Sequence, residues 1–156
     1  MSAGSGSDAR LAAELAARAG RLLLELQATS GLTGKELGKR GDVESNELVL
    51  AALAAHRPAD AVLSEESVDS PARLSADRVW IIDPLDGTRE YSEGRDDWAV
   101  HVALAIDGEP VVGAVAEPAR GTLWRSDKAT LADLHKKPGI LVSRSRAPEC
   151  AIKTCA

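Results

Sequence analysis

Acidic residues gather in the stretch VLSEESVDSPARLSADRVWIIDPLDGTREY. Glu65 and Glu66 follow one short apolar segment, and Asp83 and Asp86 follow the next one. Carboxylates, together with the backbone carbonyl of Leu85, are hard oxygen ligands of the kind that Mg²⁺ and Ca²⁺ prefer. The stretch holds no Cys or His, which disfavours zinc, copper and iron. We therefore expect a magnesium site here.

The carboxylates converge only if the two apolar segments are neighbouring strands. Two like charges roughly 4 Å apart repel by about 4 kcal/mol at an effective dielectric constant near ~20, so such a cluster needs protons, wide separation or cations. A divalent ion offsets the repulsion most directly. The alternative is that Glu65 and Glu66 are solvated loop charges, while Asp83 and Asp86 cap turns.

Gly87 and Thr88 follow Asp86 directly. Glycine permits a close backbone approach to a ligand, and N–H groups at a turn or helix start bind phosphate oxygens. A metal site beside a phosphate pocket indicates phosphoryl hydrolysis, in which paired ions activate a water and stabilise the leaving oxygen. This chemistry needs no covalent enzyme intermediate.

Helical patterns precede this stretch. Ser7 or Asp8 is expected to cap a helix with leucines and alanines at helical spacing, and a second helix is expected from Ser45 to His56. Pro58 ends the second helix. Residues 31–42 are rich in glycine and predict an irregular loop between the helices.

Extended patterns follow the helices, and Asp107-Gly108 predicts a hairpin turn. Trp98 and His101 lie in an alternating segment and are expected to pack within a strand. This order of elements predicts an α+β fold with N-terminal helices packed on a mainly antiparallel β-sheet. The expected strands are Ala61–Leu63, Arg78–Ile82, Trp98–Ile106, Pro110–Glu117, Thr122–Ser126 and Ile140–Ser143.

Composition narrows the class of partner. A chain of 156 residues with 44% hydrophobic residues is long enough for one domain with a sizeable core. A net charge of −5 argues against a nucleic acid polymer and favours a small polar molecule. No apolar stretch approaches the roughly 20 residues of a membrane span, so a cytoplasmic location is expected. Cys150 and Cys155 are expected to be free thiols.

Three segments resemble the inositol monophosphatase superfamily of lithium-sensitive, magnesium-dependent phosphatases: SEES, WIIDPLDGT and WAVHVALAIDGEPVVGAVAEPARGTLWRS. The resemblance runs from Ala9 to about Pro148. Within the superfamily, DPLDGTREY is most similar to the bacterial 3′(2′),5′-bisphosphate nucleotidases of the CysQ type. The resemblance implies that this chain has the N-terminal part of the layered αβαβα sugar-phosphatase fold and a role in sulfur metabolism.

The resemblance also implies roles for individual residues. Thr88 with Glu65 would activate a water, and Glu66 would hold the water network. Asp86, Gly87 and Thr88 would contact the phosphate of 3′-phosphoadenosine 5′-phosphate, whose hydrolysis yields AMP. The implied Mg²⁺ ligands are Glu65, Asp83, the Leu85 carbonyl and Asp86.

The chain departs from the family near the second expected helix. The family carries a Val-Thr-x-x-Asp motif whose aspartate helps to bind a further metal, whereas this chain reads VESNE from Val43. Asn46 is the first candidate for that position, and Asp42, Glu44 and Glu47 are the alternatives.

The family's C-terminal half, with a Trp-Asp motif that completes the metal site, has no counterpart after Ser143. We therefore expect a truncated chain with a disordered N-terminus (1–7), a family-like domain (8–148) and an atypical tail (149–156). An exposed apolar sheet face would then favour assembly into a homo-oligomer. The open alternatives are a phosphatase acting on inositol or fructose phosphates, and a non-catalytic fragment.

Overall fold

The computed structural model describes residues 3–130. Its helices are α1 (Ala3–Thr29), α2 (Gly34–His56) and α3 (Thr88–Ser92), with short 3₁₀ helices η1 (Pro71–Ser75) and η2 (Pro118–Arg120). Its strands are β1 (Ala61–Ser64), β2 (Arg78–Asp86), β3 (Ala99–Ile106), β4 (Glu109–Glu117) and β5 (Thr122–Arg125). The expected strand at Ile140–Ser143, the tail at 149–156 and both cysteines lie outside the described residues.

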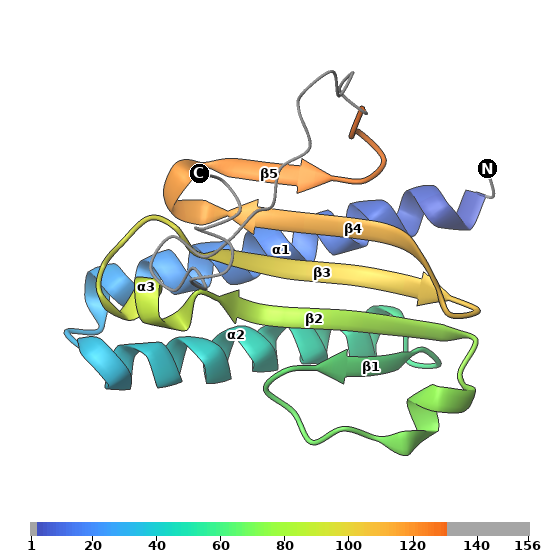
Figure 1. The fold of residues 1–156 in the computed structure, drawn as a ribbon, viewed down its shortest axis with the longest axis horizontal. Helices are drawn as coiled ribbons and strands as arrows, with labels where there is room; N and C mark the ends of the chain where they lie inside the picture. The colour runs from blue at the N-terminus through green and yellow to red at the C-terminus, as the bar shows by residue number, and fades with distance from the viewer. Residues whose placement is uncertain (1–2, 131–156) are drawn as a thin grey trace, which may run out of the picture.

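The strands form one sheet in the order β1-β2-β3-β4-β5 (Figure 1). Strand β1 runs parallel to β2, and each later pair is antiparallel. The hairpin between β3 and β4 turns at Asp107 and Gly108, whose φ angles of 52° and 81° suit a tight turn. The prediction of an α+β fold with a mainly antiparallel sheet is therefore confirmed.

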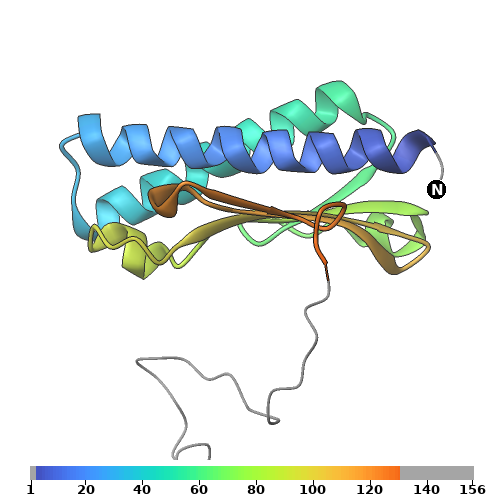
Figure 2. The same cartoon turned by 90° about the horizontal axis from the view of Figure 1, so that it is seen from above.

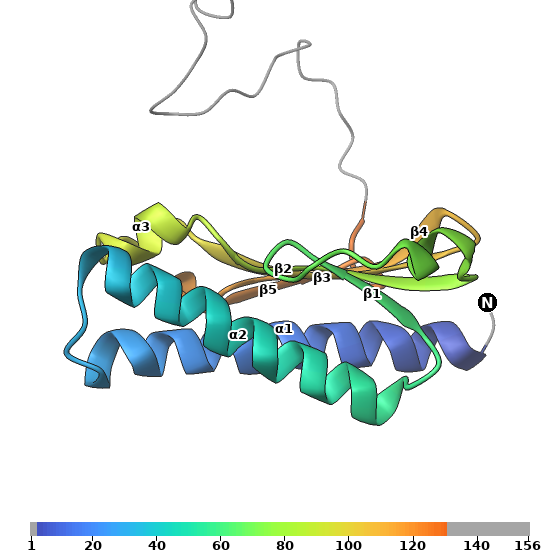
Figure 3. The same ribbon diagram turned by 90° about the horizontal axis from the view of Figure 1, so that it is seen from below.

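Helices α1 and α2 both pack on the same face of the sheet (Figures 2 and 3). The core between them is apolar and includes Leu15, Leu23, Leu53, Trp80 and Leu104. Neither long helix covers the opposite face, which we call the open face. Ile81, which lies between the buried Trp80 and Ile82, is 42% exposed, and Trp124 on the edge strand β5 is 61% exposed. The expected apolar exposure is therefore present in the described residues.

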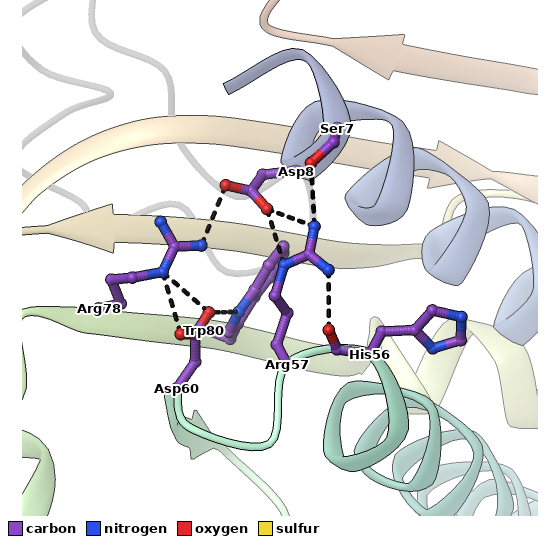
Figure 4. A network of polar contacts seen from close by, with 7 residues as sticks. All are labelled: Ser7, Asp8, His56, Arg57, Asp60, Arg78 and Trp80. Atoms are coloured by element: carbon purple, nitrogen blue, oxygen red, sulfur yellow. Dashed lines mark hydrogen bonds and ion pairs between the residues drawn. The ribbon is translucent and has the colours of Figure 1, made fainter. Parts of the chain in front are cut away.

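Helix α1 begins at Ala3, so the predicted start at Ser7 or Asp8 is wrong, and residues 3–7 belong to this helix. The physical reason is that Asp8 turns inward instead of capping the helix. Its carboxylate accepts hydrogen bonds from Arg57 at 2.8 Å and Arg78 at 3.0 Å (Figure 4). These bonds tie α1 to the end of α2 and to β2.

Helix α2 begins at Gly34, so the predicted start at Ser45 is wrong, and the irregular loop expected over residues 31–42 is confined to residues 31–33. The glycines of this segment serve close packing. A Cβ atom on Gly41 would lie 2.9 Å from Cε1 of Tyr91 and 3.1 Å from Cδ2 of Leu85. The small residues therefore bring α2 against the end of β2, where the acidic residues lie.

Candidate active site

The first pair of acidic residues lies beside the second because β1 and β2 are adjacent and parallel. Ser64 pairs with Ile82, and the N–H of Glu65 donates to the carbonyl of Ile82 at 3.2 Å. Glu65 thus leaves its strand at the level where Asp83 stands. The strands are neighbours, as the convergence of the carboxylates requires.

Asp83 and Asp86 reach the same face of the sheet through a β-bulge. Asp83 pairs with His101 and Asp86 pairs with Ala99, so β2 has one residue more than β3 between these two pairs. In a regular strand this odd spacing would place the aspartates on opposite faces. Bulges of this kind re-aim side chains beside active sites.

The bulge is fixed from the side of the helices. Pro84 is fully buried, and its carbonyl accepts a hydrogen bond from the buried hydroxyl of Ser45 at 2.7 Å. The side chain of Leu85 is 3% exposed and packs beside Gly41. Helix α2 therefore supports the bulge, which directs the Asp83 and Asp86 carboxylates away from the core.

Gly87 lets the chain turn from the bulge into α3. Its φ of 85° and ψ of 40° lie in the left-handed region, and a Cβ there would lie 3.2 Å from the carbonyl oxygen of Asp97. The turn brings Thr88 Oγ1 to 3.1 Å from the Leu85 carbonyl and 3.2 Å from Oδ1 of Asp42. A hydroxyl carries one proton, so it donates to one of these oxygens at a time.

Mutual repulsion shows that the carboxylates share one electrostatic field. Burial first, and then the charges of Glu65 and Asp86, together raise the pKa of Asp83 from 3.8 to about 6. Burial, followed by the charge of Glu66, raises the pKa of Asp42 from 3.8 to about 6. A divalent cation would favour the charged forms and offset this repulsion.

The donor set is made of carboxylate, carbonyl and hydroxyl oxygens, which suits Mg²⁺. Among residues 3–130, however, no group of three His, Cys, Asp or Glu side chains is positioned to enclose a metal ion. Glu65 and Glu66 are exposed at the end of β1, so their side chains have room to rotate. Ligation therefore requires the carboxylates to turn toward one another.

Asp42, and not Asn46, is the residue of α2 that faces this cluster. Asn46 is occupied elsewhere, because its Oδ1 accepts from Ser64 Oγ at 2.7 Å and its Nδ2 donates to Ser67 Oγ at 3.0 Å. Glu44 pairs outward with Arg40. Asn46 therefore stays a prediction for the missing aspartate position, and among the alternatives Asp42 is the one that contacts Thr88.

Asn46 instead supports the loop that carries the glutamates. Its hydrogen bonds to Ser64 and Ser67 hold both ends of the segment that contains Glu65 and Glu66. The sequence pattern missed this role because the two serines are distant from Asn46 in the chain.

His101 also belongs to the site, although it was expected to pack within a strand. Its side chain is 41% exposed, and Nε2 lies 3.2 Å from Oδ2 of Asp86. Trp98 lies just before β3, which begins at Ala99, but it packs in the core, since it is 2% exposed and its ring packs edge-on against Tyr91. The alternation of the strand places His101 on the open face.

The class of this domain is set by two long helices on one face of a mixed five-stranded sheet, with acidic residues and a Gly-Thr turn at the end of β2. Residues 7–153 match the inositol monophosphatase family model, and the chain belongs to that family. The match includes the segments SEES and WIIDPLDGT and agrees with the resemblance seen in the sequence.

Among curated proteins, the chain is 56% identical over 120 residues to the 3′-phosphoadenosine 5′-phosphate phosphatase of Mycobacterium tuberculosis, covering 72% of this chain and 45% of the relative. The protein of the same name from Mycobacterium leprae is 53% identical over 136 residues, covering 80% and 50%. The chain thus spans about half the length of these relatives.

Among solved structures, CysQ from Bacteroides thetaiotaomicron superposes with a TM-score of 0.69 at 29% identity, covering 77% of this chain and 45% of that one. Mycobacterium tuberculosis SuhB superposes with a TM-score of 0.65 at 27% identity, covering 78% and 44%. These similarities confirm the layered fold of the family.

Within residues 3–130, no helix has the length and apolar character needed to cross a bilayer.

Proposed function

We propose that Glu65, Asp83 and Asp86 form part of a magnesium-dependent phosphatase site. The reaction would hydrolyse 3′-phosphoadenosine 5′-phosphate to AMP and phosphate. The observation that carries the proposal is the bulge, which turns Asp83 and Asp86 to one face beside Glu65 and Thr88. The names of the mycobacterial relatives support the choice of substrate.

Glu65, Asp83, the Leu85 carbonyl and Asp86 would hold Mg²⁺, with Asp42 as a further ligand. When bound, Mg²⁺ supplies a positive charge that lowers the pKa of water and stabilises the phosphate oxygens. The raised pKa values of Asp42 and Asp83 support this assignment, because they reflect burial first and then neighbouring like charges, and a bound cation would offset both effects.

The remaining steps belong to the residues of the turn and the β1 loop. Thr88 Oγ1 lies between the Leu85 carbonyl and Asp42. An ionised Asp42 can therefore accept a hydrogen bond from the Thr88 hydroxyl, while the hydroxyl oxygen accepts a hydrogen bond from water. Thr88 and Glu65 would orient the attacking water, and Glu66 would hold its neighbours. Asp86, Gly87 and Thr88 would contact the phosphate.

The direct test is phosphate release from 3′-phosphoadenosine 5′-phosphate with inositol 1-phosphate and fructose 1,6-bisphosphate measured in parallel. The proposal predicts release that requires Mg²⁺, falls with Li⁺ and is fastest with the nucleotide. Faster release from either sugar phosphate would establish the alternative substrate class. Cytoplasmic location and homo-oligomerisation remain predictions.

A non-catalytic role has its own supporting observation, since the chain spans about half the length of its relatives. A fragment of this kind would bind Mg²⁺ without turning substrate over. Calorimetric titration with Mg²⁺ beside the phosphate assay separates the two functions, because binding without release supports the fragment and binding with release supports the enzyme.

A further inference from the structure

His101 lies on β3 beside the aspartates of the neighbouring strand. It stands directly across from Asp83 in the register, while the bulge moves Asp86 to the position across from Ala99. His101 Nε2 lies 3.2 Å from Oδ2 of Asp86. The imidazole therefore reaches along the open face to the second aspartate and not to the one it opposes.

We propose that His101 is a positioning residue: its Nε2–H donates to Asp86 and holds that carboxylate in the orientation that ligates Mg²⁺. The inference rests on the proposed function. It extends the site to β3, since the proposed ligands lie in β2, in α2 and just after β1.

Asp86 needs such a partner more than Asp83 does. Oδ1 of Asp83 accepts a hydrogen bond from the N–H of Leu85 at 3.2 Å, so its own backbone orients this carboxylate. The Asp86 side chain is 61% exposed at the end of its strand, and within residues 3–130 the hydrogen bond from His101 is the one that anchors it. Without that bond the side chain would lose more rotational freedom on ligation.

The chemistry of imidazole suits this role. In the neutral ring one nitrogen donates and the other accepts, and a carboxylate beside Nε2 favours the form that carries the proton there. Partners of this kind, which hydrogen-bond to metal ligands, typically contribute about 10- to 100-fold to metal affinity or activity.

Calorimetric titration of the whole chain with Mg²⁺ tests the inference. His101→Leu removes the donor at similar size, whereas His101→Gln retains an amide N–H of comparable reach. We expect His101→Leu to weaken Mg²⁺ binding by about 10- to 100-fold and His101→Gln to stay within roughly threefold of the original chain. His56→Leu is the matched control, because that ring contacts the carbonyl of Ala52 in α2.

Unfolding midpoints should stay similar in these variants, since the His101 side chain is 41% exposed. Unchanged Mg²⁺ affinity in His101→Leu would overturn the inference, and so would an equal loss in His101→Gln. Asp86→Asn separates the positioning role of His101 from the proposed metal site itself. If Asp86→Asn weakens binding and His101→Leu does not, the positioning role alone fails; if the original chain binds no Mg²⁺, the proposed metal site fails with it.

Discussion

Asp83 and Asp86 share one face of the sheet because β2 carries one extra residue between them relative to β3. The hydroxyl of Ser45 donates to the carbonyl of Pro84 inside this bulge at 2.7 Å. The geometry of the two acidic side chains therefore depends on a buried hydrogen bond from α2.

Ser45→Ala should destabilise the chain and weaken Mg²⁺ binding. Removing the hydroxyl leaves the buried Pro84 carbonyl without its donor, which costs about 1–3 kcal/mol of unfolding free energy. Urea denaturation measures this loss. Ser75→Ala is the control, since its hydroxyl bonds to the Ala72 carbonyl at an exposed site, and an equal loss in both variants would contradict the role given to the bulge.

The acidic cluster should make stability depend on pH when EDTA removes divalent cations. The pKa values of Asp42 and Asp83 are raised from 3.8 to about 6, so between these limits the folded chain holds protons that the unfolded chain has released. The unfolding free energy should therefore fall as pH rises through this window and stay lower above it.

Urea denaturation across this pH range, with Asp83→Asn beside the original chain, isolates the effect. Asp83→Asn should make the unfolding free energy decrease less as pH rises. Mg²⁺ should restore the stability of the original chain above about pH 6. The lowered pKa values of Asp69 and Asp127 act in a more acidic range and are common to both proteins. Parallel pH profiles for the two proteins would show that the cluster is not under repulsion.

Asp8 should be a major contributor to stability. Its side chain is 5% exposed and binds Arg57 and Arg78, so Asp8→Ala would leave two partly buried guanidinium groups without this partner. We expect a loss of about 2–4 kcal/mol in unfolding free energy. Glu14→Ala, which removes an exposed pair with Arg18 at 3.9 Å, should cost less than about 0.5 kcal/mol, and a similar cost for both would contradict the prediction.

Gly41→Ala should destabilise the chain although alanine favours helices. The added Cβ would lie 2.9 Å from Tyr91, 3.0 Å from Leu23 and 3.1 Å from Leu85. Crowding of this kind costs about 1–3 kcal/mol, against a gain of about 1 kcal/mol in helix propensity. Gly6→Ala in α1 meets no atom within 4 Å and should not destabilise; thermal unfolding compares them, and a more stable Gly41→Ala would refute the packing argument.

The sequence predicted the strands well because alternation and the Asp107-Gly108 turn are local signals. It missed the first part of α2, since glycines in a helix look like loop residues unless the partner helix is known. Gly38 and Gly41 are explained by Thr88 and Tyr91, which contact them from a distant part of the chain. Long-range packing decided this element.

In the candidate site, too, local sequence signals predict some features and long-range packing determines the others. Glu65, Asp83, Asp86 and Thr88 were identified from residue type and spacing, and the structure brings them to one end of β1 and β2. The bulge and the contact between His101 and Asp86 depend on strand pairing, which no local pattern reports. Residue type and spacing do not single out Asp42, because its approach to Thr88 depends on where α2 begins.

Phosphate release from 3′-phosphoadenosine 5′-phosphate, measured against Mg²⁺ concentration, tests the central claim most directly. The original chain and Glu109→Gln, which changes an exposed acid at the start of β4, should release phosphate with the same dependence on Mg²⁺. Asp83→Asn should lower release by at least about 10- to 100-fold, which is the loss typical when a mere partner of a metal ligand is removed. Release that persists in EDTA, or that survives Asp83→Asn, would contradict a magnesium site built on these carboxylates.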